Sequence, residues 1–123
     1  MKKEMIVYSI SDSLGGTSQK LLSAVTAQYP DIIFNKSYRF PFINKEDELL
    51  DILRDAIKDD ALVISTLVDG KLASVAREFS LMHGLSYLDL MHPFFEIIKE
   101  KTGRDPIEVP GTLHRLDSEY FNK

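Results

Sequence analysis

The sequence predicts an α/β protein in which a four-stranded parallel sheet carries helices on both faces. Short apolar runs alternate with longer segments in which apolar residues recur every three or four positions, the pattern of repeated strand–helix units. The run at 61–67, ALVISTL, is almost continuously apolar, as in strands that are covered on both faces. Because right-handed helical crossovers join parallel strands, these observations together predict a parallel sheet.

Two strand–helix units are predicted in the first half of the chain. The run 5–10 is short and rich in β-forming residues, which indicates a buried strand. A helix follows over about 17–29 and is expected to end at Pro30. Its apolar residues recur at helical spacing: Leu21, Leu22, Val25 and Tyr29. A second strand is predicted at 32–40, and Asn44 is expected to cap the helix after it.

Two further units are predicted in the second half. The strand at 61–67 precedes a helix over about 72–82, with Gly84 as the left-handed residue after it. A strand at 85–90 precedes a helix at about 93–101 that stops at Gly103. The expected strand order is 2-1-3-4, in a three-layer arrangement of the flavodoxin or Rossmann type. We expect one domain over 1–103, a connector over 104–123, and a short helix at 117–122.

Composition excludes several classes of function. The chain has no cysteine, which rules out disulfides, thiolate catalysis and cysteine-based zinc sites. A net charge of -4 argues against a nucleic-acid partner. No stretch approaches the length of a membrane span, and the run 5–10 is too short for a signal peptide, so a cytoplasmic protein without membrane contact is expected. The three histidines lack metal-ligand spacing, so no metal site is predicted.

The stretch SDSLGGTS at 11–18 is the strongest candidate for a site. In a sheet of this type, ligands bind beyond the carboxyl ends of the strands where the strand order reverses, here between the first and third strands. The loops at 11–18 and 66–70 meet at that point, and the start of a helix favours an anion. The predicted anion- or cleft-binding residues are Ser11, Asp12, Ser13, Gly15, Gly16, Thr17 and Asp69.

Other readings of these residues stay open. Ser, Asp, Gly and Thr are also the turn and cap residues that any first strand–helix connection needs. Arg39, at the exit of the second predicted strand, is a candidate anion contact, with a surface ion pair as the alternative. Neither G-x-G-x-x-G nor G-x-x-x-x-G-K-[ST] occurs, so no nucleotide loop is predicted and no catalytic residue is assigned.

Four segments in this order resemble a known family. They are IVYSISDSLGGTSQKL at 6–21, RFPFI at 39–43, TLVD at 66–69 and PGTLHRLDSEYF at 110–121. Together they are similar to the N-terminal part of the regulatory proteins of pyruvate phosphate dikinase and phosphoenolpyruvate synthase, and the resemblance covers essentially the whole chain. It implies a bifunctional enzyme. One activity uses ADP to phosphorylate a threonine of the dikinase or synthase; the other uses phosphate to remove that group and releases pyrophosphate.

The resemblance also implies elements that lie outside this sequence. The family's nucleotide loop, of the type Gly-x-Ser-Arg-Thr-Ser-Lys-Thr, lies downstream of HRLDSEYF, and the sequence given ends at Lys123. We therefore expect 104–123 to lead toward a nucleotide-binding kinase domain. This chain alone is expected to bind no cofactor, although the family uses ADP and phosphate, and to lack kinase and phosphorylase activity. Gly16 stands where the family commonly has an acidic residue, and Ser18 where it has alanine.

Two roles therefore remain for the chain. In the first, it is a regulatory or cleft-completing domain whose partners are the dikinase or synthase and the kinase domain. In the alternative, it is a non-enzymatic α/β module that senses a small anion or binds proteins. That module would bind its target, or a second copy as a homodimer, through the apolar residues of MHPFF at 91–95 and EYF at 119–121.

Overall fold

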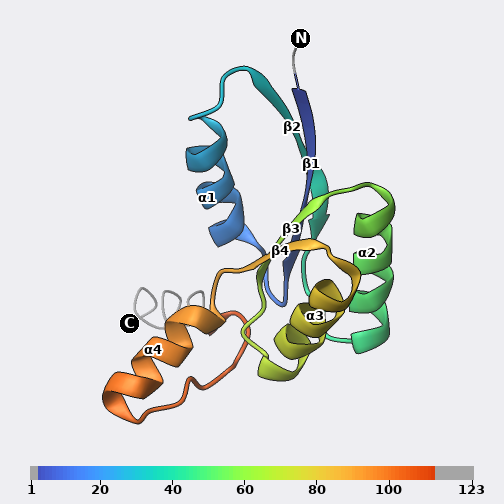
Figure 1. Ribbon diagram of the computed structural model, residues 1–123. Coiled ribbons are helices and arrows are strands. Elements are labelled where there is room, and N and C mark those ends of the chain that lie inside the picture. The colour runs from blue at the N-terminus through green and yellow to red at the C-terminus, as the bar shows by residue number, and fades with distance from the viewer. Residues whose placement is uncertain (1–2, 113–123) are drawn as a thin grey trace.

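The computed structural model describes residues 3–112, and in this range strands and helices alternate along the chain (Figure 1). The elements are β1 (Lys3–Ser11), α1 (Gly16–Thr26), β2 (Ile32–Phe40), α2 (Glu46–Lys58), β3 (Leu62–Thr66), α3 (Gly70–His83), β4 (Ser86–Asp89) and α4 (His92–Thr102). All strand pairs are parallel, and the sheet order is β2-β1-β3-β4. The predicted fold class and strand order are confirmed. The helix predicted at 117–122 lies outside the described residues.

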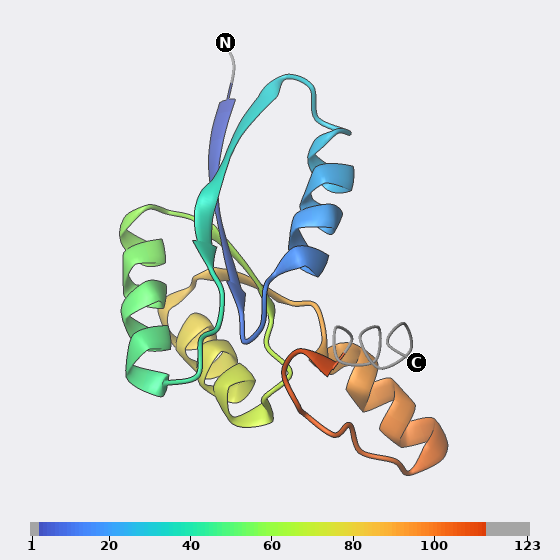
Figure 2. The ribbon, with the colours of Figure 1, turned by 180° about the vertical axis from the view of Figure 1, so that it is seen from behind.

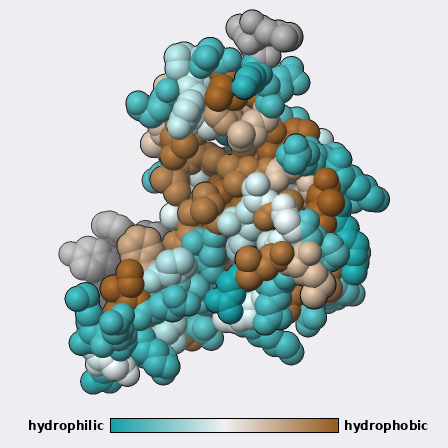
Figure 3. Space-filling view, viewed as in Figure 1, coloured by the Kyte–Doolittle hydropathy of each residue, from teal (hydrophilic) through white to brown (hydrophobic). Residues whose placement is uncertain are grey.

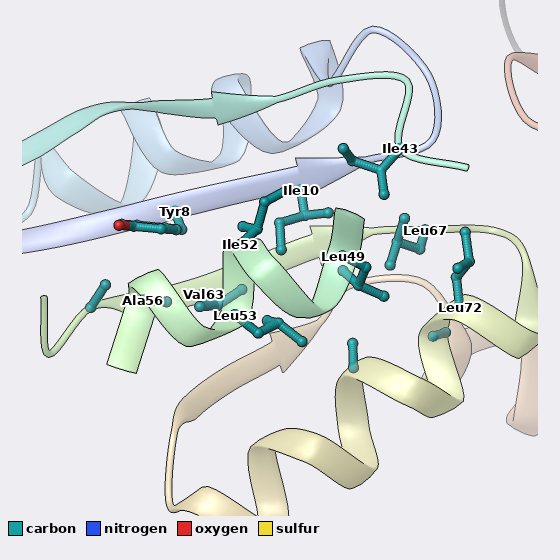
Figure 4. Packing of buried hydrophobic residues seen from close by; sticks show 13 residues of the cluster. Tyr8, Ile10, Ile43, Leu49, Ile52, Leu53, Ala56, Val63, Leu67 and Leu72 are labelled. Carbon is teal, nitrogen blue, oxygen red and sulfur yellow. The ribbon is translucent and has the colours of Figure 1, made fainter. Parts of the chain in front are cut away.

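The main core lies on the sheet face that α2 and α3 cover. Tyr8 and Ile10 of β1 and Val63 of β3 point to this face and pack against Leu49 and Leu53 of α2, as Figure 4 shows from close by. All five side chains are at most 2% exposed. The Tyr8 ring also stacks on Tyr38, and its hydroxyl donates to the Asp59 carboxylate. These contacts fix the central strands from which the candidate loops emerge.

The opposite face carries a much smaller core. Val7 of β1, Ile64 of β3 and Leu22 of α1 form its buried cluster, with partly buried neighbours around it. Among the described helices, α1 alone lies over this face, because α4 extends away from the sheet and has no buried residue (Figures 1 and 2). Helices do flank both faces, but the two faces are covered to different extents.

Helix ends follow local chemistry, with two corrections to the sequence-based boundaries. Gly84 and Gly103 end α3 and α4 with φ of 66° and 72°, as predicted. The prediction that Asn44 caps α2 is wrong, because Lys45 occupies the N-cap position, and its side chain makes no capping hydrogen bond. The acidic first turn of α2 still favours its start. α1 ends at Thr26, so Tyr29 lies beyond the helix that was predicted to contain it.

None of the helices within residues 3–112 combines the length and the apolar character that crossing a membrane requires.

Candidate functional site

A cavity of about 330 Å³ lies at the carboxyl edge of the sheet, beside the ends of β1 and β3. This is the position that the reversal of strand order predicts for a ligand. Its lining combines the loop after β1 with the end of β3, the start of α4 and the segment that follows α4. The lining residues are Ser13, Gly15, Gly16, Thr17, Thr66, Val68, Met91, Val109, Gly111 and Thr112. Hydroxyl and apolar groups therefore share the wall, and none of the lining residues within 3–112 carries a charged side chain.

The start of α1 forms one wall of this cavity. Gly15 is the N-cap residue and adopts a φ of 82°, a left-handed conformation that glycine accepts without strain. No side chain within residues 3–112 caps the helix, and its first turn contains no acidic residue. A Cβ atom on Gly16 would meet no heavy atom within 4 Å, so the described residues leave this position open. Free amides and the helix dipole at such a start favour an anion.

Asp12 ties the two loops of the site together and does not line the cavity. Its Oδ2 accepts hydrogen bonds from the backbone amides of Val68 at 2.9 Å and Asp69 at 3.1 Å. The residue is 8% exposed, and Oδ1 has no hydrogen-bond partner among the described residues. Burial raises the pKa of the Asp12 carboxyl, although the two amides act in the opposite direction. Its visible role is to hold the β1–α1 loop against the β3–α3 loop.

Ser11 and Asp69 likewise use their polar atoms within the loops. The Ser11 hydroxyl accepts from the amide of Ser13 at 3.0 Å. The Asp69 carboxylate caps α3 by accepting from the amides of Lys71 at 2.9 Å and Leu72 at 3.1 Å. Neither residue lines the cavity. Among the predicted site residues, the structure brings Ser13, Gly15, Gly16 and Thr17 together around it, whereas Ser11, Asp12 and Asp69 shape the loops.

Arg39 lies outside this cavity. It borders a separate hollow of about 10 Å³, together with Ser9, Ser11, Gln19 and their neighbours. In this hollow the Gln19 side chain donates to the Ser9 hydroxyl at 3.2 Å. The structure therefore places Arg39 in a hollow that also borders Gly15 and Ser18 at the start of α1, but not in the cavity that Gly16 and Thr17 line.

The segment after α4 supplies site residues that the sequence did not predict. Residues 104–112 return toward the sheet, so that Val109, Gly111 and Thr112 reach the cavity (Figure 2). The Glu108 carboxylate lies so close to the start of α3 that a Cβ on Gly70 would come within 2.5 Å of its Oε1. The prolines and glycines in this segment indicated turns, but no local pattern indicated where the turns would lead.

A second polar hollow, of about 190 Å³, lies between α3 and α4. Arg77, Asp89, His92 and Glu96 are among its lining residues. Asp89 caps α4 by accepting from the amides of Met91 and His92, at 2.9 and 3.0 Å. A ring nitrogen of His92 lies 2.9 Å from the carbonyl oxygen of Leu67. Within residues 3–112, no cluster of three or more histidine, aspartate or glutamate side chains is placed to hold a metal ion.

The fold and its cavity define a doubly wound α/β domain with a site at the carboxyl edge of its sheet, to which the described residues contribute hydroxyl and apolar groups. The family model described as Kinase/pyrophosphorylase matches residues 7–123, so the chain belongs to that family. Proteins provisionally named pyruvate, phosphate dikinase regulatory protein are 95% identical in Streptococcus gordonii and 89% identical in Streptococcus sanguinis. A relative in Enterococcus faecalis, with the same provisional name and the suffix 1, is 63% identical.

The alignments also show how much of these relatives the chain represents. Each covers all 123 residues of this chain, and 46%, 45% and 46% of the three relatives in turn. The chain matches their N-terminal portion and therefore spans a little less than half of their length. These findings confirm the resemblance at the level of the family.

Proposed function

We propose that this chain is the N-terminal part of a regulator of pyruvate, phosphate dikinase, and that it completes a cleft with the remainder of that protein. The family's description and the names of the relatives support this role. In the complete regulator, a threonine hydroxyl of the dikinase takes the terminal phosphoryl group of ADP, so that phosphothreonine forms and AMP and a proton are released. In the reverse regulation, a phosphate oxygen takes that phosphoryl group, which releases the threonine and pyrophosphate. Positioning and charge stabilisation dominate such phosphoryl transfers.

The part that we assign to this chain is the binding of a small phosphate-like anion in the 330 Å³ cavity. The observation that carries this assignment is the uncapped start of α1, Gly15 to Thr17, in the cavity wall. Ser13 and Thr66 line the same space, and their hydroxyls are neutral groups that can donate to an anion, whereas the Thr112 hydroxyl donates to the Val109 carbonyl. The carboxylates of Asp12 and Asp69 do not line this cavity and accept hydrogen bonds from backbone amides.

Calorimetric titration with phosphate, pyrophosphate and ADP tests this assignment. We expect heat of binding for phosphate or pyrophosphate, and amide chemical shift changes in an NMR titration at Gly16 and Thr17. Thr17→Val removes one hydroxyl and should weaken binding about fivefold, since one hydrogen bond contributes about 1 kcal/mol. Thr26→Val is the matched control, because Thr26 lies at the other end of α1 and bonds to the Leu22 carbonyl. Absence of heat with all three anions at millimolar concentrations would contradict the assignment.

A second candidate function is recognition of the target enzyme by α4. This helix has no buried residue, and Phe94, Ile97 and Ile98 are 68%, 53% and 50% exposed. Capture of purified dikinase on the immobilised chain tests it. We expect Phe94→Ala to weaken capture, whereas Leu81→Ala, which removes an equally exposed apolar side chain on α3, should leave it unchanged. Equal capture by both variants would argue against α4 as the contact.

A further inference from the structure

The sheet face beneath α1 is left partly open. Leu22 of α1 is 5% exposed where it packs on Val7 and Ile64, but Val25, one turn further along the same helix, is 46% exposed. Met5 lies two residues before Val7 on β1, points to the same face and is 40% exposed. The space-filling view shows a hollow with hydrophobic walls beside α1 (Figure 3). The apolar stripe of α1 therefore has more surface than the described residues cover.

The uncovered surface continues across the sheet to β4. Leu88 of β4 pairs in register with Ile64 of β3, so both side chains point to the α1 side of the sheet. Ile64 is 3% exposed, whereas Leu88 is 54% exposed. In a doubly wound sheet a helix normally covers this position. Here α4 extends away from the sheet (Figure 1), which leaves an open apolar face of Met5, Val25 and Leu88.

We propose that, in the full-length proteins of this family, a segment of the C-terminal half docks on this open face between α1 and β4. The relatives contain more than half of their length beyond the part that this chain matches. Thr112, the last described residue, lines the cavity together with Gly15 and Thr17, so the chain leaves the described part beside the start of α1. Several exposed apolar side chains on one face are typical of an interface.

Covalent continuity favours this occupant over a second copy of the chain. A segment on the same polypeptide has an effective concentration in the millimolar range, which exceeds the concentration of any free partner at ordinary protein levels. The proposal goes beyond the proposed function, because it requires neither an anion in the cavity nor phosphoryl transfer.

Thiol protection provides the test, because the 123-residue chain contains no cysteine. Val25→Cys and Leu88→Cys place single thiols on the open face, and Leu81→Cys places a control thiol on α3, where the native side chain is 78% exposed. Each variant is made in the 123-residue chain and in the same chain extended by the C-terminal half of the Streptococcus gordonii relative. The extended protein without an introduced cysteine is the control, and its reaction with the reagent is subtracted from that of the variants. Reaction rates with a disulfide reagent are then compared.

We expect both open-face thiols to react at least about tenfold more slowly in the extended chain, while the Leu81→Cys thiol reacts equally in both. Equal rates at all three positions would overturn the proposal. Protection that already exists in the 123-residue chain and grows with its concentration would also overturn it, by showing that a second copy covers the face. Hydrogen exchange of the two unmodified proteins gives the same comparison without substitutions, with slower exchange in α1 and β4 expected only in the extended chain.

Discussion

Replacement of Asp12 tests how the two loops at the carboxyl edge are held together. Asp12→Ala removes the oxygen that accepts from the amides of Val68 and Asp69. Each lost hydrogen bond contributes about 1 kcal/mol, and more where the donor is left without water. Both amides belong to partly exposed residues, which water can reach in the variant. We therefore expect the free energy of unfolding to fall by about 2 kcal/mol at neutral pH.

The raised pKa of Asp12 adds a pH dependence with a definite sign. A carboxyl whose pKa is higher in the folded protein binds more protons there than in the unfolded chain. Its contribution to stability is therefore fully present below its ordinary pKa of 3.8 and is lost as the pH rises through the folded value. Asp12→Asn keeps an acceptor but does not titrate. The difference in stability between wild type and Asp12→Asn should therefore shift against the wild type as the pH rises from about 4.

Urea unfolding of the three proteins, followed by circular dichroism between pH 3.5 and 7, measures both effects. Asp31→Ala is the control, because Asp31 is exposed and makes no side-chain hydrogen bond within residues 3–112. Its effect should stay within about 0.5 kcal/mol. If Asp12→Ala destabilises no more than this control, the two amide bonds do not hold the loops together. A pH-independent difference for Asp12→Asn would refute the part of the reasoning that rests on burial.

Three further predictions concern the residues around the site. Gly15→Ala should destabilise the fold by about 1 kcal/mol, because φ is 82° at this position. Gly16→Ala should stabilise it by about 0.5 kcal/mol, since a Cβ there meets no heavy atom of the described residues within 4 Å. A higher unfolding temperature for Gly15→Ala than for Gly16→Ala would contradict both. Asp69→Ala should lower the free energy of unfolding by about 1 kcal/mol through loss of the α3 cap, while Asp69→Asn should change it little. If urea unfolding shows similar losses of stability for both variants, the result would argue against capping by Asp69. Burial raises the pKa of Tyr87 to about 12, so stability should fall as the pH rises from about 10 to 12. Tyr87→Phe should make this fall smaller without abolishing it, because burial raises the pKa of Tyr8 as well; an absorbance titration checks the phenol directly.

The fold could be predicted because its signals are local and repeated. The strand predicted at 32–40 has those bounds in the structure, and the glycines after α3 and α4 end their helices as predicted. The cap of α2 could not be predicted with the same ease. Asn44 has the usual side chain for the role, but the extended backbone conformation that marks the N-cap belongs to Lys45. Which of two neighbouring residues becomes the N-cap depends on the backbone conformation of the whole loop before the helix.

The candidate site could be located from the sequence, but its composition could not. The reversal of strand order correctly placed the loops at 11–18 and 66–70 side by side. Which side chains line the cavity depends on where each polar atom finds its partner across the two loops. Asp12 turns toward the amides of the neighbouring loop and not toward the cavity. Thr112 reaches the cavity only because the segment after α4 returns to the sheet, a long-range contact without a local signal.

Helical periodicity shows which side of α1 is apolar, but it cannot show what covers that side. The pattern at Leu21, Leu22 and Val25 is that of a buried stripe, yet only Leu22 is buried among these three. Periodicity reflects the surface that a helix offers, and burial depends on whether another element is present to meet it. The exposed residues of the stripe therefore agree with the predicted helix and differ only from its expected burial.

The position of α1 makes it a shared support for two surfaces at once. Its first turn forms a wall of the cavity, and its apolar stripe borders the open face, while Ser18 and Leu22 are its only buried residues. A helix with so few buried side chains should unfold locally at a low free energy cost, and a bound ligand should stabilise its folded form. An anion at its start and a segment packed along its side would then each favour the same ordered helix. Each should therefore strengthen the binding of the other, by an equal factor in both directions.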